Sequence, residues 1–303
     1  MNPPTPATPA APDFLWWRDG IIYQIYPRSF ADSNADGLGD LRGITSRLDY
    51  LADLGIDAIW MSPFFPSPDK DFGYDISNYC EVDPRFGNLD DFDHLVAEAH
   101  RRGIRIVLDM VLNHTSDQHP WFQEARASRD NPKRDWYIWR DKPNNWAASF
   151  GGSAWSRDPA SGQFYLHLFT PEQPDLNWRN PEVHQAMLDV FRFWLERGTD
   201  GFRLDVFNAY FKHPDLPDNP SRPGLVAFER QHHIYEMDQP EMVPFLQELR
   251  RLLDAYPERY AVGETYLATA EKILRYCGED RLHAAFSFEF SNFDSKLVLL
   301  TGL

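Results

Sequence analysis

The most informative segment is Gly201-Phe202-Arg203-Leu204-Asp205-Val206, a short apolar run of β-strand character that leads into a carboxylate. Val262-Gly263-Glu264-Thr265 repeats this pattern later in the chain. In parallel barrels, functional side chains lie at the C-terminal ends of the strands, and each strand is followed by a helix. We therefore expect Asp205 and Glu264 to face each other across one pocket. Taken alone, a buried Asp205 that only pairs with Arg203 at a strand end is an equally good interpretation.

Strand-like and helix-like segments alternate along most of the chain. Short apolar runs predict strands at residues 21–25, 57–61 and 104–109, before Asp205, and at 260–263 and 282–288. Between them, apolar residues at helical spacing predict helices at 44–54, 91–102, 183–197 and 242–256. This alternation predicts an α/β fold with a parallel sheet and right-handed crossovers.

The segment from about residue 114 to residue 177 interrupts the alternation. It is too long for an ordinary βα loop, and it is rich in aromatic residues, whereas disordered loops are poor in them. We therefore expect 114–177 to form a small inserted subdomain after the third strand. Residues 1–15, rich in proline and alanine, are interpreted as a flexible tail, and 16–113 with 178–303 as the main domain.

Composition and charge narrow the functional classes. The 303 residues carry a formal net charge of −16, which argues against nucleic acid or an anionic membrane as partners, because both need basic patches. Cys80 and Cys277 are too few for a disulfide framework and lie in no metal-binding spacing. No apolar run approaches the ~20 residues of a membrane span. The N-terminus also lacks the features of a signal peptide, so the expected location is cytoplasmic.

Two further motifs precede the acid-bearing segments. Asp109-Met110-Val111-Leu112-Asn113-His114 ends the third predicted strand, and Gln173-Pro174-Asp175-Leu176-Asn177 lies near the end of the insertion. The four motifs, in this order, resemble the α-amylase family of retaining glycosidases, glycoside hydrolase family 13. The most similar branch is that of α-glucosidases and oligo-1,6-glucosidases. The resemblance implies a (β/α)8 TIM-type barrel and a retaining α-glucosidase acting on α-1,6 bonds, α-1,4 bonds or both in short glucosides, without an organic cofactor.

The resemblance also implies roles for the two acids. Asp205 matches the nucleophile that forms a covalent glucosyl intermediate, and Glu264 matches the general acid/base. Such a reaction needs one ionised carboxylate and one carboxyl group that is protonated at neutral pH. Arg203 lies two residues before Asp205 on a strand and faces the same side. We expect it to keep Asp205 ionised and oriented.

Three residues match family positions that contact the sugar in the reacting subsite. His114 and Asp75 match residues that hydrogen-bond its hydroxyls, and Tyr74 matches a ring that stacks on it. A metal-binding role for His114 is not expected, because no second ligand lies at helix or strand spacing from it.

Four more residues match positions in or beside the family's pocket. Phe150, Phe169 and Gln173 match residues of the insertion that line it, although core packing is nearly as good an interpretation of the two rings. Val206 directly follows the nucleophile. At this position the branch tends to carry valine in enzymes that cleave α-1,6 bonds and threonine in strict maltases.

The segment 32–40, Asp-Ser-Asn-Ala-Asp-Gly-Leu-Gly-Asp, places oxygen ligands at alternate positions, which suits a hard cation such as Ca²⁺. It also resembles the calcium loop that follows the first strand in the oligo-1,6-glucosidase branch. The alternative is a polar turn without an ion. The expected ligands of this structural ion are Asp32, Asn34, Asp36, the Leu38 carbonyl and Asp40.

The sequence departs from the family pattern after Glu264. The family's third carboxylate, an aspartate in an Asn-His-Asp or similar motif after strand seven, has no counterpart. The alternation stops near the sixth of eight β/α units, and the family's C-terminal β-sandwich is absent. On this interpretation, residues 1–303 are a truncated, incomplete barrel with negligible activity.

Other functional classes share most of these features. A glucosyl transferase or isomerase, such as a sucrose isomerase or a trehalose synthase, would keep the same acids and differ in the access of water. A non-catalytic relative, or a defective fragment, would keep the fold alone. The expected partner is a small oligosaccharide or glucoside, and the complete enzyme is expected to be monomeric.

Overall fold

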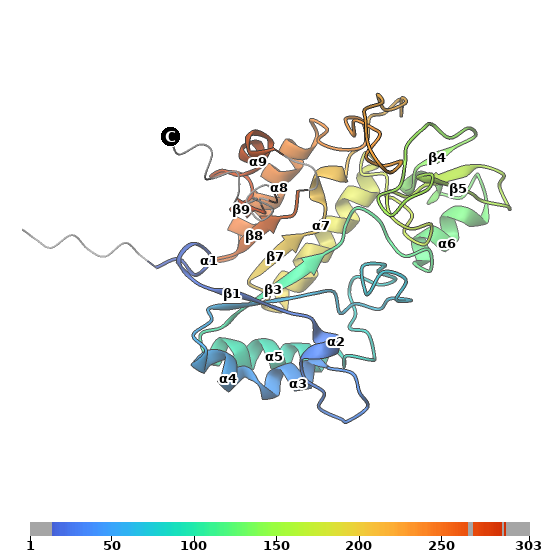
Figure 1. Ribbon diagram of the computed structural model, residues 1–303. Coiled ribbons are helices and arrows are strands. Elements are labelled where there is room, and N and C mark those ends of the chain that lie inside the picture. The colour runs from blue at the N-terminus through green and yellow to red at the C-terminus, as the bar shows by residue number, and fades with distance from the viewer. Residues whose placement is uncertain (1–13, 266–268, 287, 289–303) are drawn as a thin grey trace, which may run out of the picture.

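The computed structural model describes residues 14–265, 269–286 and 288. Its main element is a parallel sheet of six strands in the order β1-β2-β3-β7-β8-β9, which forms half of a barrel (Figure 1). The strands are β1 (Ile22–Ile25), β2 (Ala58–Met61), β3 (Arg105–Met110), β7 (Gly201–Leu204), β8 (Tyr260–Gly263) and β9 (Ala284–Ala285). The predicted α/β fold is confirmed, and each predicted strand has a counterpart. Residue 287 of the sixth predicted strand lies outside the described residues.

The register of the sheet aligns the strand ends that carry the acids. Arg203 of β7 pairs with Asp109 of β3, and the Glu264 amide donates a hydrogen bond to the Leu204 carbonyl (2.9 Å) just beyond β8. Because parallel strands point the same way, Asp109, Asp205 and Glu264 all lie at the C-terminal edge of the sheet.

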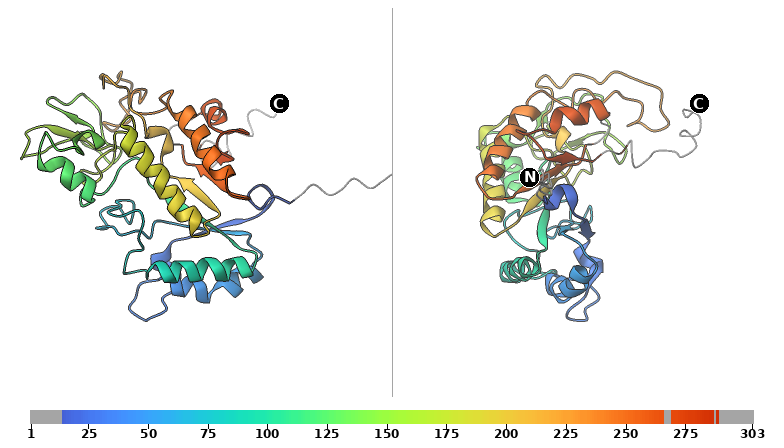
Figure 2. Two further views of the ribbon diagram at one scale, coloured as in Figure 1. Left: turned by 180° about the vertical axis from the view of Figure 1, so that it is seen from behind. Right: turned by 90° about the vertical axis from the view of Figure 1, so that its left-hand side faces the viewer.

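Helices cover the outer face of the sheet. Figures 1 and 2 show α3, α4 and α5 beside the part formed by β1 to β3, and α7 and α8 beside the part formed by β7 to β9. The helices are α1 (Trp16–Asp19), α2 (Pro27–Phe30), α3 (Leu41–Ser46), α4 (Leu48–Asp53), α5 (Leu89–Arg101), α6 (Pro120–Ala127), α7 (Pro181–Glu196), α8 (Met242–Asp254) and α9 (Ala270–Tyr276). The described residues also form two 3₁₀ turns, η1 (Arg134–Trp136) and η2 (Phe207–Ala209).

Three of the four predicted helices correspond to α5, α7 and α8. The fourth, predicted at 44–54, is wrong as a single helix: it is replaced by α3, which starts at Leu41, and α4, with a break at Arg47. The Thr45 and Ser46 hydroxyls donate hydrogen bonds back to helical carbonyls at 2.9 and 2.7 Å, a contact that bends helices. None of the helices in the described ranges is long and apolar enough to cross a membrane.

The two faces of the sheet bury different side chains. Ile59 and Leu108 belong to the large core that the sheet shares with the surrounding helices. Val107 and Tyr260 point to the opposite face of the sheet and belong to a separate cluster. There Trp16 of α1 packs edge-on against Tyr260, with ring centroids 5.3 Å apart. The short helix α1 thus covers the inner face at the end away from α6 and β4 (Figure 1).

The segment between β3 and α7 forms an antiparallel sheet of its own. Its strands are β4 (Trp139–Arg140), β5 (Trp155–Arg157) and β6 (Phe164–Leu166), in the order β4-β6-β5. An antiparallel bridge between His114 and Asp175 joins its two ends.

The long segment between η2 and α8, which the sequence assigned to the main domain, packs on this insertion. The Trp146 indole donates a hydrogen bond to the Pro217 carbonyl (2.8 Å). Phe228 and Met237 join Trp146 in a second hydrophobic cluster, to which Val206 also belongs. The insertion therefore touches the turn that follows Asp205.

Candidate active site

A cleft of about 260 Å³ lies at the C-terminal edge of β3, β7 and β8, against the insertion. Its walls are formed by Asp71, Tyr74, His114, Phe150, Phe169, Arg203, Asp205, Val206 and Glu264. The predicted catalytic and sugar-binding residues all line it except Asp75 and Gln173. Asp71 lines it without having been predicted.

Arg203 is the centre of the charged group in the cleft. Its Nη1 lies 2.6 Å from Asp109 Oδ1 and 2.6 Å from Asp205 Oδ1, and its Nη2 lies 2.6 Å from Glu264 Oε2. The arginine side chain is only 5% exposed. One buried guanidinium therefore contacts three carboxylates, an arrangement that its planar, multiple donors allow and a lysine ammonium would not reproduce.

The charges in this group do not balance. If all were ionised, three carboxylates would face one positive charge. Burial raises the pKa of Asp205 well above its ordinary value, Arg203 opposes this, and Glu264 and Asp109 add to it. Arg203 thus favours the ionised form of Asp205, as expected, but the single guanidinium is shared among three acids and does not offset burial. Burial lowers the pKa of Arg203, but the same acids outweigh this and raise it overall, so the arginine stays charged.

Val206 makes a sharp turn directly after the acid that ends β7. Its φ of 37° and ψ of 40° lie in the left-handed region, which β-branched residues rarely enter. The turn directs its backbone N–H to Glu264 Oε2 at 3.3 Å, while its buried side chain packs in the second hydrophobic cluster. Strained backbone of this kind persists where the surrounding packing fixes it, and it is common at functional sites.

His114 and Gln173 lie side by side on the insertion's wall of the cleft. Gln173 Nε2 donates a hydrogen bond to Asp71 Oδ2 (2.9 Å) and lies 3.0 Å from His114 Nε2. His114 Nε2 also lies 3.1 Å from the Tyr74 carbonyl, and burial lowers the pKa of the His114 ring, which favours its neutral form. Gln173 is fully buried, so it positions two cleft residues without lining the cleft itself.

Asp75 does not reach the cleft. Its oxygens accept hydrogen bonds from the Ser67 hydroxyl (2.8 Å) and from the backbone amides of residues 70 and 71 (3.0 and 3.1 Å). These contacts contradict the prediction that Asp75 binds sugar hydroxyls, and Asp71 stands in the cleft wall instead. The reason is local, because Phe72 has a φ of 50° and the loop reverses between the two acids.

Aromatic rings form the rest of the wall. The Tyr74 hydroxyl donates a hydrogen bond to Asp109 Oδ2 (3.1 Å). The Phe169 ring lies 5.2 Å from that of His114, and the Phe150 ring lies 5.7 Å from that of Phe169. Phe150 is 65% exposed, so its ring is accessible to a ligand, whereas the other rings are held by their neighbours.

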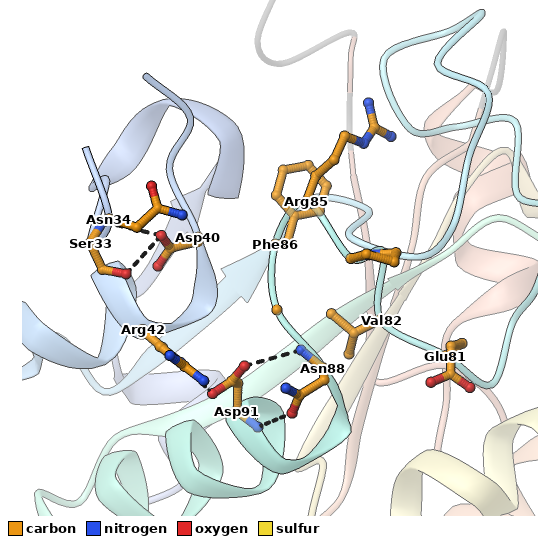
Figure 3. A pocket seen from close by; sticks show the side chains of 12 residues that line it. Ser33, Asn34, Asp40, Arg42, Glu81, Val82, Arg85, Phe86, Asn88 and Asp91 are labelled. Atoms are coloured by element: carbon orange, nitrogen blue, oxygen red, sulfur yellow. Dashed lines mark hydrogen bonds and ion pairs between the residues drawn. The ribbon is translucent and has the colours of Figure 1, made fainter. Parts of the chain in front are cut away.

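The predicted metal loop lies away from the cleft, between α2 and α3. Asp32 accepts hydrogen bonds from the amides of residues 34, 35 and 37 at 2.7 to 3.0 Å, and Asp40 caps α3 through the Gly43 amide (2.6 Å). Asn34 and Asp40 line a separate cavity of about 500 Å³ (Figure 3). Within the part of the chain that the structure describes, no three His, Cys, Asp or Glu side chains are grouped to hold a metal ion. The calcium site stays a prediction.

Three residues near the cleft were missed by the sequence analysis. Asp71 lies in the same acid-rich loop as Asp75, and only the loop conformation separates their roles. Trp60 lies in the predicted strand at 57–61, and its indole donates a hydrogen bond to Asp109 (3.2 Å). Lys212 lies outside every motif, yet it is buried and forms an ion pair of 2.6 Å with Asp175 of the Gln-Pro-Asp-Leu-Asn segment.

Known proteins are similar to this chain in sequence and fold. A family model described as "Alpha amylase, catalytic domain" matches residues 24–298. A probable α-glucosidase of Rhizobium meliloti (strain 1021) is 53% identical over 300 residues, covering 92% of this chain and 54% of that protein. An oligo-1,6-glucosidase of Parageobacillus thermoglucosidasius is 46% identical over 288 residues, covering 93% and 51%.

A solved structure gives the same comparison in three dimensions. The crystal structure of an α-glucosyl transfer enzyme matches with a TM-score of 0.88 and 52% identity, covering 91% of this chain and 55% of that one. The chain thus spans about half the length of the relatives it matches.

The charge imbalance predicts that Asp205→Asn stabilises the fold at neutral pH. A carboxyl group whose pKa is higher in the folded state holds more protons there, so the free energy of unfolding falls as pH rises between the unfolded and folded pKa values. Replacing a functional group of this kind commonly adds about 1 kcal/mol, or ~2 °C in Tm. The gain should shrink as the pH is lowered toward the pKa of an unfolded aspartate.

Thermal unfolding followed by circular dichroism from pH 4 to pH 8 measures this gain. Asp93→Asn is the matched control, because Asp93 is a surface partner of Arg197 and exposed pairs contribute little. A Tm for Asp205→Asn equal to or below that of the unchanged protein at every pH contradicts the prediction.

Proposed function

This chain belongs to the α-amylase family, and we propose that its cleft hydrolyses short α-glucosides with retention of the anomeric configuration. The observation that carries the proposal is the contact of one guanidinium with both Asp205 and Glu264, at 2.6 Å each. It holds two carboxyl groups from neighbouring strand ends on one wall of one small cleft. Two closely spaced carboxyl groups are the requirement of the retaining reaction.

In the proposed first step, a carboxylate oxygen of Asp205 forms a bond to the anomeric carbon. The glycosidic C–O bond breaks, and the leaving oxygen takes the proton of Glu264. In the second step, water attacks the anomeric carbon, gives a proton to the Glu264 carboxylate, and the bond to Asp205 breaks. Asp205 regains its charge and Glu264 its proton, so the site returns to its starting state.

The resting cleft has to redistribute a proton before this reaction. Glu264 hydrogen-bonds Asp205 and raises its pKa, whereas the mechanism needs Asp205 ionised and Glu264 protonated. A sugar ring that enters between the two carboxyl groups would break their contact. Asp205 would then keep its hydrogen bond to Arg203, which favours the ionised form.

The substrate class is proposed from the size of the cleft and from the relatives. A volume of about 260 Å³ suits one sugar ring and part of a second rather than a long polysaccharide. The similar proteins are named as an α-glucosidase and an oligo-1,6-glucosidase. Tyr74, His114 and Asp71 supply hydroxyl, imidazole and carboxylate groups around the space where a sugar would lie.

A second candidate is glucosyl transfer to a sugar acceptor. It is favoured by the likeness to a solved α-glucosyl transfer enzyme. Both reactions share the glucosyl-Asp205 intermediate and differ only in whether water or an acceptor hydroxyl attacks it. The ratio of glucose released to glucosyl product formed from maltose separates them.

Loss of either acid tests the main proposal. In the protein that carries this chain, Asp205→Asn and Glu264→Gln should each lower the hydrolysis of p-nitrophenyl α-glucoside by at least ~10³-fold, because acids that act as one unit fail together. Glu264→Gln should still react with α-glucosyl fluoride, whose leaving group needs no acid. Mass spectrometry should then detect one glucosyl residue on Asp205.

The matched control is Glu258→Gln, since Glu258 pairs with Arg105 outside the cleft and its loss should leave the rate unchanged. An adduct on any residue other than Asp205, or a product of inverted configuration, excludes the retaining mechanism.

We propose that Val206 favours α-1,6 bonds over α-1,4 bonds. Val206 lines the cleft. Threonine is also branched at Cβ, so Val206→Thr exchanges a methyl group for a hydroxyl and places similar demands on the backbone conformation. One added hydrogen bond of about 1 kcal/mol should lower the isomaltose-to-maltose ratio of kcat/KM about 5-fold. Val226→Thr, at an exposed valine, is the control. An unchanged ratio means that this position does not decide linkage.

We also propose that the loop at 32–40 binds Ca²⁺ as a structural ion. Its support is the alternation of Asp32, Asn34 and Asp36 along the loop, followed by Asp40. Asp32 Oδ2 and Asp40 Oδ1 each accept one hydrogen bond, at 2.8 and 2.6 Å, so each keeps a second lone pair. Saturation at 100 times Kd should add ~2.7 kcal/mol to the free energy of unfolding. A Tm that responds neither to chelator nor to added Ca²⁺ removes this proposal. Asp32→Ala should abolish the Ca²⁺-dependent shift, and Asp53→Ala on α4 should keep it.

A further inference from the structure

A buried polar chain runs behind the cleft, and the proposed reaction does not use most of it. Lys212 Nζ lies 2.6 Å from Asp175 Oδ2 and donates a hydrogen bond to Asn113 Oδ1 at 2.7 Å. Asn113 Nδ2 lies 3.1 Å from His114 Nδ1. These four side chains are nearly or fully buried, and only His114 lines the cleft.

The ammonium group fixes the orientation of the Asn113 amide. A lysine ammonium has three donors and no acceptor, whereas an asparagine amide has one acceptor oxygen and one donor nitrogen. The atom of Asn113 that faces Lys212 must therefore be the oxygen. Rotating the amide by 180° would place two donors against each other next to a buried charge, which is costly. The amide nitrogen consequently faces His114.

The orientation of Asn113 in turn fixes the proton on His114. Nδ1 faces an amide donor, so it has to be the unprotonated, accepting nitrogen. The remaining proton belongs on Nε2, which has the Tyr74 carbonyl as an acceptor at 3.1 Å. An imidazolium is disfavoured by the same contact, because it would direct the Nδ1–H at the Asn113 amide.

Gln173 does not reverse this assignment. Its Oε1 accepts hydrogen bonds from the Thr170 amide and hydroxyl at 3.1 and 3.0 Å. Its Nε2 donates to Asp71 at 2.9 Å and lies 3.3 Å from the Tyr74 carbonyl. The second hydrogen of this amide can thus be directed at the same carbonyl as the His114 Nε2–H, since a carbonyl oxygen has two lone pairs.

We infer that the ion pair of Lys212 and Asp175, acting through Asn113, holds His114 as the neutral tautomer with its proton on Nε2. The N–H of the ring is then at Nε2, where the Tyr74 carbonyl accepts it in the resting protein and a sugar hydroxyl in the cleft would compete for it. Lys212, Asp175 and Asn113 are positioning residues that act through His114. The consequence for a sugar hydroxyl rests on the function proposed above, whereas the tautomer is a property of the resting protein.

A charged group suits this task better than a neutral one. A glutamine or asparagine at position 212 could turn its amide and leave Asn113 free to do the same. The ammonium offers no such choice, and Asp175 compensates its charge at 2.6 Å. Lys212 belongs to the segment after η2 and Asp175 to the end of the insertion. The tautomer of His114 therefore depends on both segments being in place.

Long-range ¹H–¹⁵N NMR of the unchanged protein at neutral pH tests the inference without any substrate. The His114 signals, identified by their loss in His114→Asn, should show a protonated Nε2 and an unprotonated Nδ1. A protonated Nδ1, or a ring protonated on both nitrogens, overturns the inference. Because this readout needs no turnover, it stands apart from the test of the proposed function.

Two variants test the cause. Asn113→Asp replaces the donor by a second acceptor and should move the proton to Nδ1 or protonate both nitrogens. With p-nitrophenyl α-glucoside it should lower kcat/KM about 10-fold, mainly through KM. The charge-neutral double variant Lys212→Met with Asp175→Asn should show a mixture of tautomers, and Lys272→Met, which removes a lysine paired with Asp238, should not. A single Nε2–H tautomer in both test variants refutes the role of the ion pair.

Discussion

The structure of the cleft depends on one guanidinium. Arg203 is the only group that contacts Asp109, Asp205 and Glu264 together among the described residues, and these acids come from the ends of three adjacent strands. The parallel register brings the three ends to one edge of the sheet, but carboxylates at that distance repel each other. A planar cation with several donors can hold them in a fixed geometry. The same side chain therefore connects the three strand ends and compensates part of their negative charge.

The second constraint is the turn at Val206, which connects the acids to the insertion. Its left-handed backbone is unfavourable for valine, so contacts on both sides must maintain it. Its amide donates to Glu264, and its side chain belongs to the hydrophobic cluster that also contains Phe228 and Trp146. The insertion and the segment after η2 thus hold the strained backbone directly after Asp205. This explains why a subdomain remote in sequence bears on the geometry of the acids.

Sequence reasoning predicted the parts of this arrangement that depend on strands. Apolar runs that end on Asp205 and Glu264 located two of the acids, and parallel geometry then placed them at one edge. Sequence reasoning failed where a loop conformation or a buried charge decides which side chains reach the cleft. Asp71 and Asp75 lie four residues apart in one loop, and only the positive φ of Phe72 shows which one enters the cleft. Lys212 belongs to no periodic pattern in the sequence. Its contacts come from the insertion and from the end of β3, which lie far from it in the sequence.

The two buried charge groups differ in balance, and this difference separates their roles. Lys212 and Asp175 carry one charge of each sign and are closely paired, so the pair is suited to holding a fixed orientation. The group around Arg203 has three acids for one cation, and burial raises the pKa of Asp205. In the proposed reaction, ester formation at Asp205 removes one buried negative charge, and proton donation by Glu264 restores one. The excess of acids raises the pKa of Asp205, and in the proposed reaction the total charge of the group stays constant through the first step. A group with one charge of each sign would hold its geometry equally well but would not favour a protonated carboxyl group.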